Sequence, residues 1–81
     1  MGRTLATTNQ LILDEQQAFK DFRRALRLAD QHHFDTLFAA ARKHVAAVSQ
    51  VSHALPFEAV LLAMLIEQEK RITHLESLLY G

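Results

Sequence analysis

Six basic side chains are the residues of this chain best suited to chemistry, because together they could grip phosphate groups. Four of them follow one another at helical spacings of three and four, which places them on one face of a predicted helix. The set consists of Lys20, Arg23, Arg24, Arg27, Arg42 and Lys43. A nucleic-acid surface is one interpretation of this set. The other, which we favour, is a solvated helix face partly neutralised by Asp21.

Five histidines raise the question of a metal site. His32 and Asp35 lie three residues apart, and Glu67 and His74 lie two helical turns apart. These spacings give neither a Glu-x-x-His pair nor a His-Glu-x-x-His zinc motif. We therefore predict no metal and no cofactor, and we expect His44 to be a hydrogen-bonded packing residue. Because histidines titrate near neutrality, they could instead make assembly sensitive to pH.

Signals of catalysis are missing from the sequence. The only two glycines are Gly2 and Gly81, so no glycine-rich phosphate loop occurs. Ser49 and Ser52 lie close to His53, but neighbours in sequence do not make a catalytic triad and nothing in the pattern orients them. We expect a protein that is not an enzyme, with no small-molecule substrate indicated.

The size and charge of the chain set further limits. Its 81 residues correspond to one domain with a small core. The chain has no cysteine, so no disulfide can stabilise that core. Nine basic and nine acidic side chains give a formal net charge of zero, which argues against binding nucleic acid or membrane by bulk charge. The apolar run over residues 59–66 is too short to span a bilayer, which needs about 20 residues. We expect a cytoplasmic protein without a membrane partner.

The pattern of apolar residues predicts an all-α fold. No segment alternates with period two for long, and no internal glycine offers a hairpin turn. The predicted helices cover residues 9–29, 31–51 and 56–79. They form a single domain over residues 8–81, preceded by a tail, residues 1–7, that is a candidate for disorder.

Single residues mark the predicted helix ends. We expect the first helix to begin between Thr8 and Asp14. Asp30 is the expected N-cap of the second helix. Pro56 is well tolerated at a first helical position and restricts the residue before it, so the third helix should begin there.

The third predicted helix carries more apolar surface than a chain of this size can cover. Residues 59–66 are apolar on every side of the helix, which therefore must be surrounded. A stripe with spacings of four and three, the a/d pattern of a coiled coil, runs along the helix. Its members are Leu61, Leu65, Gln68, Ile72, Leu75 and Leu79. We predict a three-helix bundle or hairpin with a long C-terminal helix, assembled through this stripe as a homo-oligomeric helical bundle.

Two alternatives remain open at this point. The same stripe could pack on the first two helices within one chain. The pattern also leaves parallel and antiparallel pairing undecided. In a parallel dimer Arg71 would face the partner's Glu76, and Gln68 could fix the register through a hydrogen bond.

Several short motifs form a recognisable set along the chain. They are Met1-Gly2-Arg3-Thr4, Phe22-Arg23-Arg24-Ala25-Leu26-Arg27, Asp30-Gln31-His32-His33-Phe34-Asp35, Ala41-Arg42-Lys43-His44 and the Arg-Ile-x-x-Leu-Glu-x-x-Leu ending of residues 67–79. Together they resemble a family of small uncharacterised proteins from archaea, including halophiles. The resemblance would cover most of the chain and implies an archaeal cytoplasmic protein with no known activity. Since halophile members are expected to be more acidic, the zero net charge suggests a source without high internal salt.

These observations lead to three hypotheses about function. The first is a non-enzymatic interaction or regulatory module that forms a homodimer or a larger assembly through its third helix. The second is a nucleic-acid-associated protein that uses the six basic residues. The third is a small subunit of a larger complex, in which the apolar stripe meets a different protein.

Overall fold

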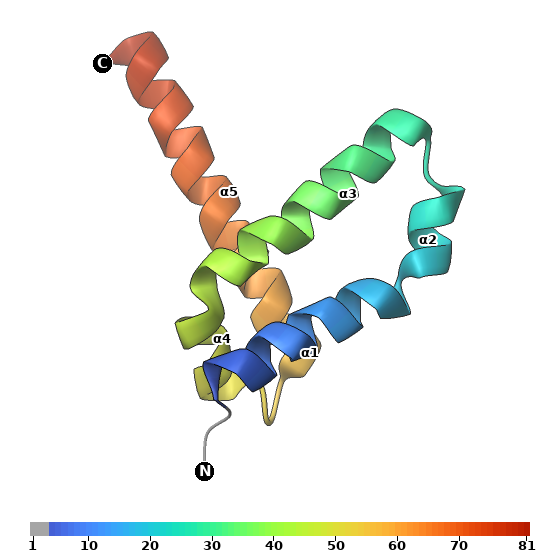
Figure 1. Ribbon diagram of the computed structural model, residues 1–81. Helices are drawn as coiled ribbons and strands as arrows, with labels where there is room; N and C mark the ends of the chain where they lie inside the picture. The colour runs from blue at the N-terminus through green and yellow to red at the C-terminus, as the bar shows by residue number, and fades with distance from the viewer. Residues whose placement is uncertain (1–3) are drawn as a thin grey trace.

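The computed structural model describes residues 4–81, and every regular element among them is helical (Figure 1). The elements are α1 (Leu5–Ala18), α2 (Lys20–Ala25), α3 (Leu28–Ala41), the 3-10 turn η1 (Arg42–His44), α4 (Val45–Val51) and α5 (Pro56–Tyr80). The all-α fold with a long C-terminal helix is therefore confirmed. The three predicted helices are divided into more pieces than the sequence indicated.

Helix α1 begins earlier than predicted. Thr4 is its N-cap, since the Thr4 side-chain oxygen accepts a hydrogen bond from the Thr7 backbone N–H at 3.0 Å. Thr8, a predicted boundary residue, is fully buried inside the helix. The expected start at residue 9 is thus corrected to Leu5. Of the predicted tail, residues 4–7 belong to the cap and first turn, and residues 1–3 lie outside the described residues.

The predicted helix over residues 9–29 is interrupted twice. Helix α1 ends at Phe19, whose ring stacks on Phe57 of α5 with 5.2 Å between ring centroids. The chain turns again at Leu26 and Arg27, where the backbone is extended. The apolar periodicity continues through both breaks, so packing between distant residues overrides a local pattern that predicted one helix.

Helix α3 begins at Leu28, so Asp30 lies in its first turn and is not its N-cap. A different side chain stabilises the turn before α3. Gln31 Nε2 donates a hydrogen bond to the Leu26 carbonyl oxygen at 3.1 Å. Asp30 still places a negative charge near the positive end of the helix dipole.

The predicted helix over residues 31–51 changes direction at η1. Helices α3 and α4 both contact α1 and α5, and α3 makes its most extensive contact with α5. The 3-10 turn between α3 and α4 changes the direction of the chain. Helix α5 ends one residue beyond the predicted 56–79.

One apolar core joins α1, α3, α4 and α5, and α2 contributes no buried residue to it. Its members are Ile12, Phe34, Phe38, Ala41, Val48, Ala59, Val60, Ala63 and Met64. Figure 1 shows α1, α2 and α3 as three sides of an open frame, with the C-terminal half of α5 extending away from the other helices. The molecule measures 44 × 31 × 17 Å, so it is thin and open.

The contribution of this core can be measured at two neighbouring positions of α1. Ile12 is fully buried and Leu13 is 41% exposed. We expect Ile12→Ala to lower the free energy of unfolding by about 2–5 kcal/mol, because it leaves a cavity among four helices. Leu13→Ala should change it by about 0.5 kcal/mol or less. Urea unfolding of both variants at one protein concentration checks this, and equal losses would contradict the described packing of α1.

Candidate functional site

The predicted interface stripe lies on the solvent side of α5. Five of its six residues are between 43% and 75% exposed, and Gln68 is half-buried. The five are Leu61, Leu65, Ile72, Leu75 and Leu79. We call the six together the α5 seam. Within residues 4–81 the chain does not cover the seam, so the alternative of a purely intramolecular stripe is not supported.

A different face of α5 serves the chain's own core. The residues buried there are Ala59, Val60, Ala63, Met64 and Glu67. At 100° per residue, the seam lies about 130° around the helix from this buried face. Helix α5 therefore has two apolar faces, of which its own chain uses one.

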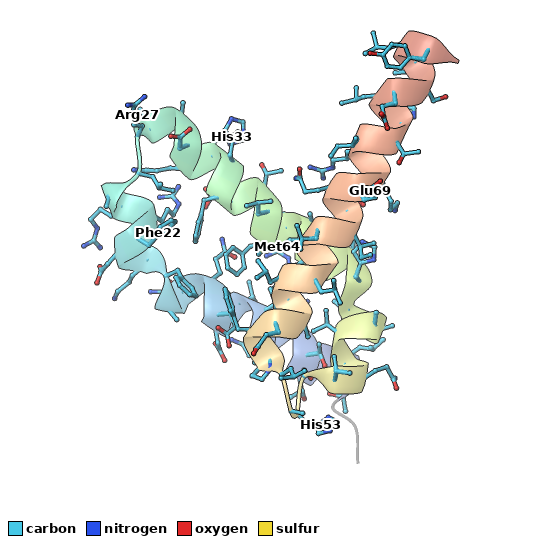
Figure 2. All side chains as sticks on the ribbon, turned by 180° about the vertical axis from the view of Figure 1, so that it is seen from behind. Phe22, Arg27, His33, His53, Met64 and Glu69 are labelled. Carbon is cyan, nitrogen blue, oxygen red and sulfur yellow. The ribbon has the colours of Figure 1, made fainter. Side chains whose placement is uncertain are left out.

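The last part of α5 is exposed all around. Every residue from Ile72 to Gly81 is exposed, and this end projects beyond the other helices in Figure 1 and Figure 2. Leu78 and Tyr80, which lie off the seam, are 69% and 84% exposed. Exposed apolar side chains gathered in this way are typical of interaction sites.

The polar residues that flank the seam are free to pair across an interface. Arg71 is half-buried and Glu76 is exposed, and neither makes an ion pair within residues 4–81. The pair predicted to bridge two chains is therefore not already satisfied inside one chain.

The six basic residues do not form one surface. Arg23 is occupied by Asp35, to which its Nε and Nη2 donate at 2.7 and 2.8 Å, and Nη1 donates to Gln31 at 3.2 Å. Arg24 lies 3.4 Å from Asp21. Arg27 leaves the shared face because the chain turns there.

The other basic residues are divided between the two ends of α3. Lys20 lies on α2 before the start of α3, whereas Arg42 and Lys43 form part of η1 at its far end. Helix α3, whose 14 residues span about 21 Å, lies between these two groups along the chain. The predicted face of four residues on one helix is corrected for Arg27, which lies beyond the end of α2, whereas Lys20, Arg23 and Arg24 remain together on α2.

A buried carboxylate that the sequence analysis did not single out lies where α5 meets η1. Glu67 is 3% exposed, and its carboxylate lies 3.3 Å from Lys70 Nζ and 3.9 Å from His44 Nε2. Burial acts to raise the pKa of Glu67, but Lys70, Lys43 and His44 outweigh it, so that the pKa lies below its ordinary value. The signal in the sequence was one acidic residue on a helix face that is otherwise apolar.

His44 differs from its prediction. It is half-buried, as a packing residue would be, but within residues 4–81 its Nε2 has no hydrogen-bond partner. The Glu67 Oε2 that faces it is likewise buried without one. The other histidines are scattered, and Figure 2 shows His33 on α3 far from His53 in the joint before α5.

Among the described residues, no group of three or more histidines and acidic side chains is placed to hold a metal ion. None of the described helices combines the length and the apolar character needed to cross a bilayer.

All five phenylalanines of the chain converge on one open pocket, which the sequence analysis also did not single out. Their rings come from α2, α3, α5 and the joint between α1 and α2. Centroids are 6.1 Å apart for Phe22 and Phe34 and 5.0 Å apart for Phe34 and Phe38. Leu37, Leu61 and Met64 complete the wall. Phenylalanines on separate predicted helices gave no periodic signal that could have indicated this pocket.

The chain belongs to the family described as a domain of unknown function (DUF8156), whose model matches residues 1–80. This match is consistent with the sequence resemblance to an uncharacterised family. No curated protein and no solved structure matches the chain.

The ion pair between Arg23 and Asp35 predicts a dependence of stability on pH. The hydrogen bond from Arg23 holds the pKa of Asp35 below its ordinary value. A carboxylate with a lowered folded-state pKa stabilises the fold above its unfolded pKa of about 4, and this stability is lost as the pH falls through the lower folded value. We expect Asp35→Asn to have a lower thermal midpoint than the wild type at neutral pH, and the difference to shrink in acid.

The control for this measurement is Glu69→Gln, which removes an exposed carboxylate that makes no ion pair within residues 4–81. Its thermal midpoint should follow that of the wild type across the same pH series. A deficit of Asp35→Asn that persists unchanged in acid would contradict the assigned ion pair.

Proposed function

We propose that this member of the family is a non-enzymatic helical module that forms a homodimer through the α5 seam and acts in interaction or regulation. The observation that carries the proposal is the exposure of five apolar seam residues on one face of α5. A second copy of the chain has the same seam. If a two-fold axis parallel to α5 relates the two copies, each seam covers the other.

The surface area of the chain supports this proposal. Its accessible surface is 5934 Å², whereas a compact protein of 9.2 kDa exposes about 4,900 Å². The difference, about 1,000 Å², is similar to the roughly 800 Å² that each partner buries in an interface of standard size. The radius of gyration is 14.1 Å, against about 12 Å for a compact domain of this length.

The charges beside the seam favour parallel pairing. With Leu65, Ile72 and Leu79 at a positions, Glu69 and Glu76 fall at e, and Arg71 falls at g. Parallel helices would place Arg71 near the partner's Glu76. Antiparallel helices, centred on the same seam, would place Glu69 near the partner's Glu69 and Arg71 near the partner's Arg71, which repel.

The middle of the seam favours the same orientation. In a parallel dimer Gln68 faces the partner's Gln68, so the two side-chain amides can hydrogen-bond to each other. In an antiparallel dimer Gln68 faces the partner's Ile72 and loses that partner. A polar pair at one seam position fixes the register at some cost in stability. We therefore propose a parallel, in-register seam.

The two other hypotheses have less support. Nucleic-acid binding through the six basic residues is not favoured, because Arg23 is already paired and the remainder lie at two ends of α3. A different protein in place of the second copy would also cover the seam, and the experiment below separates this possibility. An archaeal source and a cytoplasmic location stay predictions from the sequence.

The test is the molar mass in solution of three chains, measured by light scattering after size exclusion over a range of concentrations. We expect the wild type to have twice the 9.2 kDa mass of the chain. Ile72→Asp should have the mass of one chain, because it places a charge at a central seam position that is 49% exposed in the single chain. Because that side chain is outside the core, the variant should keep its helical circular dichroism.

The matched control is Thr73→Asp, which adds the same charge at the next position, on an exposed face away from the seam. It should have the mass of the wild type. A wild type that stays at 9.2 kDa would contradict self-association and direct attention to a different protein. Dissociation by both variants would show that the seam is not the interface.

A further inference from the structure

The phenylalanine pocket is a recess enclosed by several helices of one chain. It has a volume of about 230 Å³, and its walls come from the end of α1, from α2, α3 and α5. Figure 2 places Phe22 on α2 and Met64 where α5 passes α3. Phe22 is 58% exposed at one edge, whereas Phe34, Phe38 and Met64 are buried. The recess therefore has a buried apolar floor and an open edge.

The chemistry of the walls restricts the ligand class. Only phenylalanine, leucine and methionine line the recess, so no side chain there can donate or accept a strong hydrogen bond. A charged or strongly polar ligand would lose its hydration without compensation. Dry apolar cavities of about 150 Å³ bind benzene or xenon. The larger recess here suits a neutral apolar molecule of one or two fused rings.

The dimensions argue against a partner helix as the occupant. A helix with its side chains is about 10–12 Å across, too wide to enter a recess of this volume. Only a single side chain of another protein could do so. A small molecule fills the recess completely, which is how ligand pockets gain most of their affinity.

Helix α2 is built as a movable edge of the recess. It has six residues, buries none of them, and is bounded by the breaks at Phe19 and Leu26. Its main side-chain tie to α3 is the Arg23 bridge to Asp35 and Gln31. A short helix held by this polar bridge and by the contact of Phe22 with Phe34 can move more readily than the helices that form the core.

We propose that this recess is a binding site for a small, neutral, apolar ligand with one or two aromatic rings or an alkyl group of similar volume. The site is independent of the α5 seam in its chemistry, although Leu61 belongs to both. Such a ligand would contact the aromatic walls through dispersion and through edge and face contacts between rings.

The proposal can be tested with naphthalene as the probe ligand. Its binding is followed through the signal of the Met64 methyl group. Of the described residues, Met64 is the one methionine, and it lines the recess. In protein with ¹³C-labelled methionine methyl groups, we expect naphthalene to shift the Met64 signal by its ring current in a saturable way.

Two pocket variants and a control make the result specific. Leu37→Trp fills the recess and should weaken naphthalene binding about tenfold or more. Leu13→Trp adds the same ring to α1 outside the recess and should leave the affinity within about twofold of the wild type. If Leu37→Trp fails to fold, Phe22→Ala removes an exposed wall and should also weaken binding while helicity is retained.

The outcomes that overturn the proposal are distinct from those that overturn the dimer. No saturable shift of Met64 in either the wild type or Ile72→Asp would exclude the site. A shift in Ile72→Asp but none in the wild type would show that a second copy of the chain fills the recess. Equal affinities of wild type and Leu37→Trp would place the bound naphthalene elsewhere.

Discussion

Helix α5 is apolar on two faces, and the rest of the chain is large enough to cover only one of them. The core-facing side of α5 supplies four of the nine residues of the described core, while the seam about 130° away lies open. An 81-residue chain without disulfides has few ways to resolve this conflict. The thin, open shape is a consequence, because the helices that could have wrapped α5 form an open frame on one side of it.

The sequence predicted those features that depend on local pattern. The all-α class, the start of α5 at Pro56 and the exposed a/d stripe all rest on periodicity or on proline geometry, which act within a few residues. The breaks at Phe19 and Leu26 could not be predicted, because the stacking of Phe19 on Phe57 and the bridge from Arg23 to Asp35 are set by the tertiary fold. The break at Leu26 also removed Arg27 from the helix face on which the sequence had placed four basic residues.

The two features that the sequence analysis missed have one origin. The phenylalanine pocket and the buried Glu67 both arise where α5 meets segments far from it in the sequence. Glu67 places a charge on the core-facing side of α5. The fold tolerates this charge because Lys70 and His44 lie beside the carboxylate, and Lys70 lowers the pKa of Glu67. Before Glu67 in the sequence, the buried face of α5 is apolar. After Glu67, α5 extends away from the other helices.

We propose that two copies of the α5 seam lie side by side, in parallel and in register. The most direct measurement is disulfide formation by Leu79→Cys, because the chain has no other cysteine and a disulfide needs Cα atoms within about 7 Å. The account predicts rapid cross-linking of Leu79→Cys into a covalent dimer on a non-reducing gel, and little cross-linking of the off-seam control Thr73→Cys. Cross-linking of Leu79→Cys no faster than that of Thr73→Cys would contradict a parallel α5 seam.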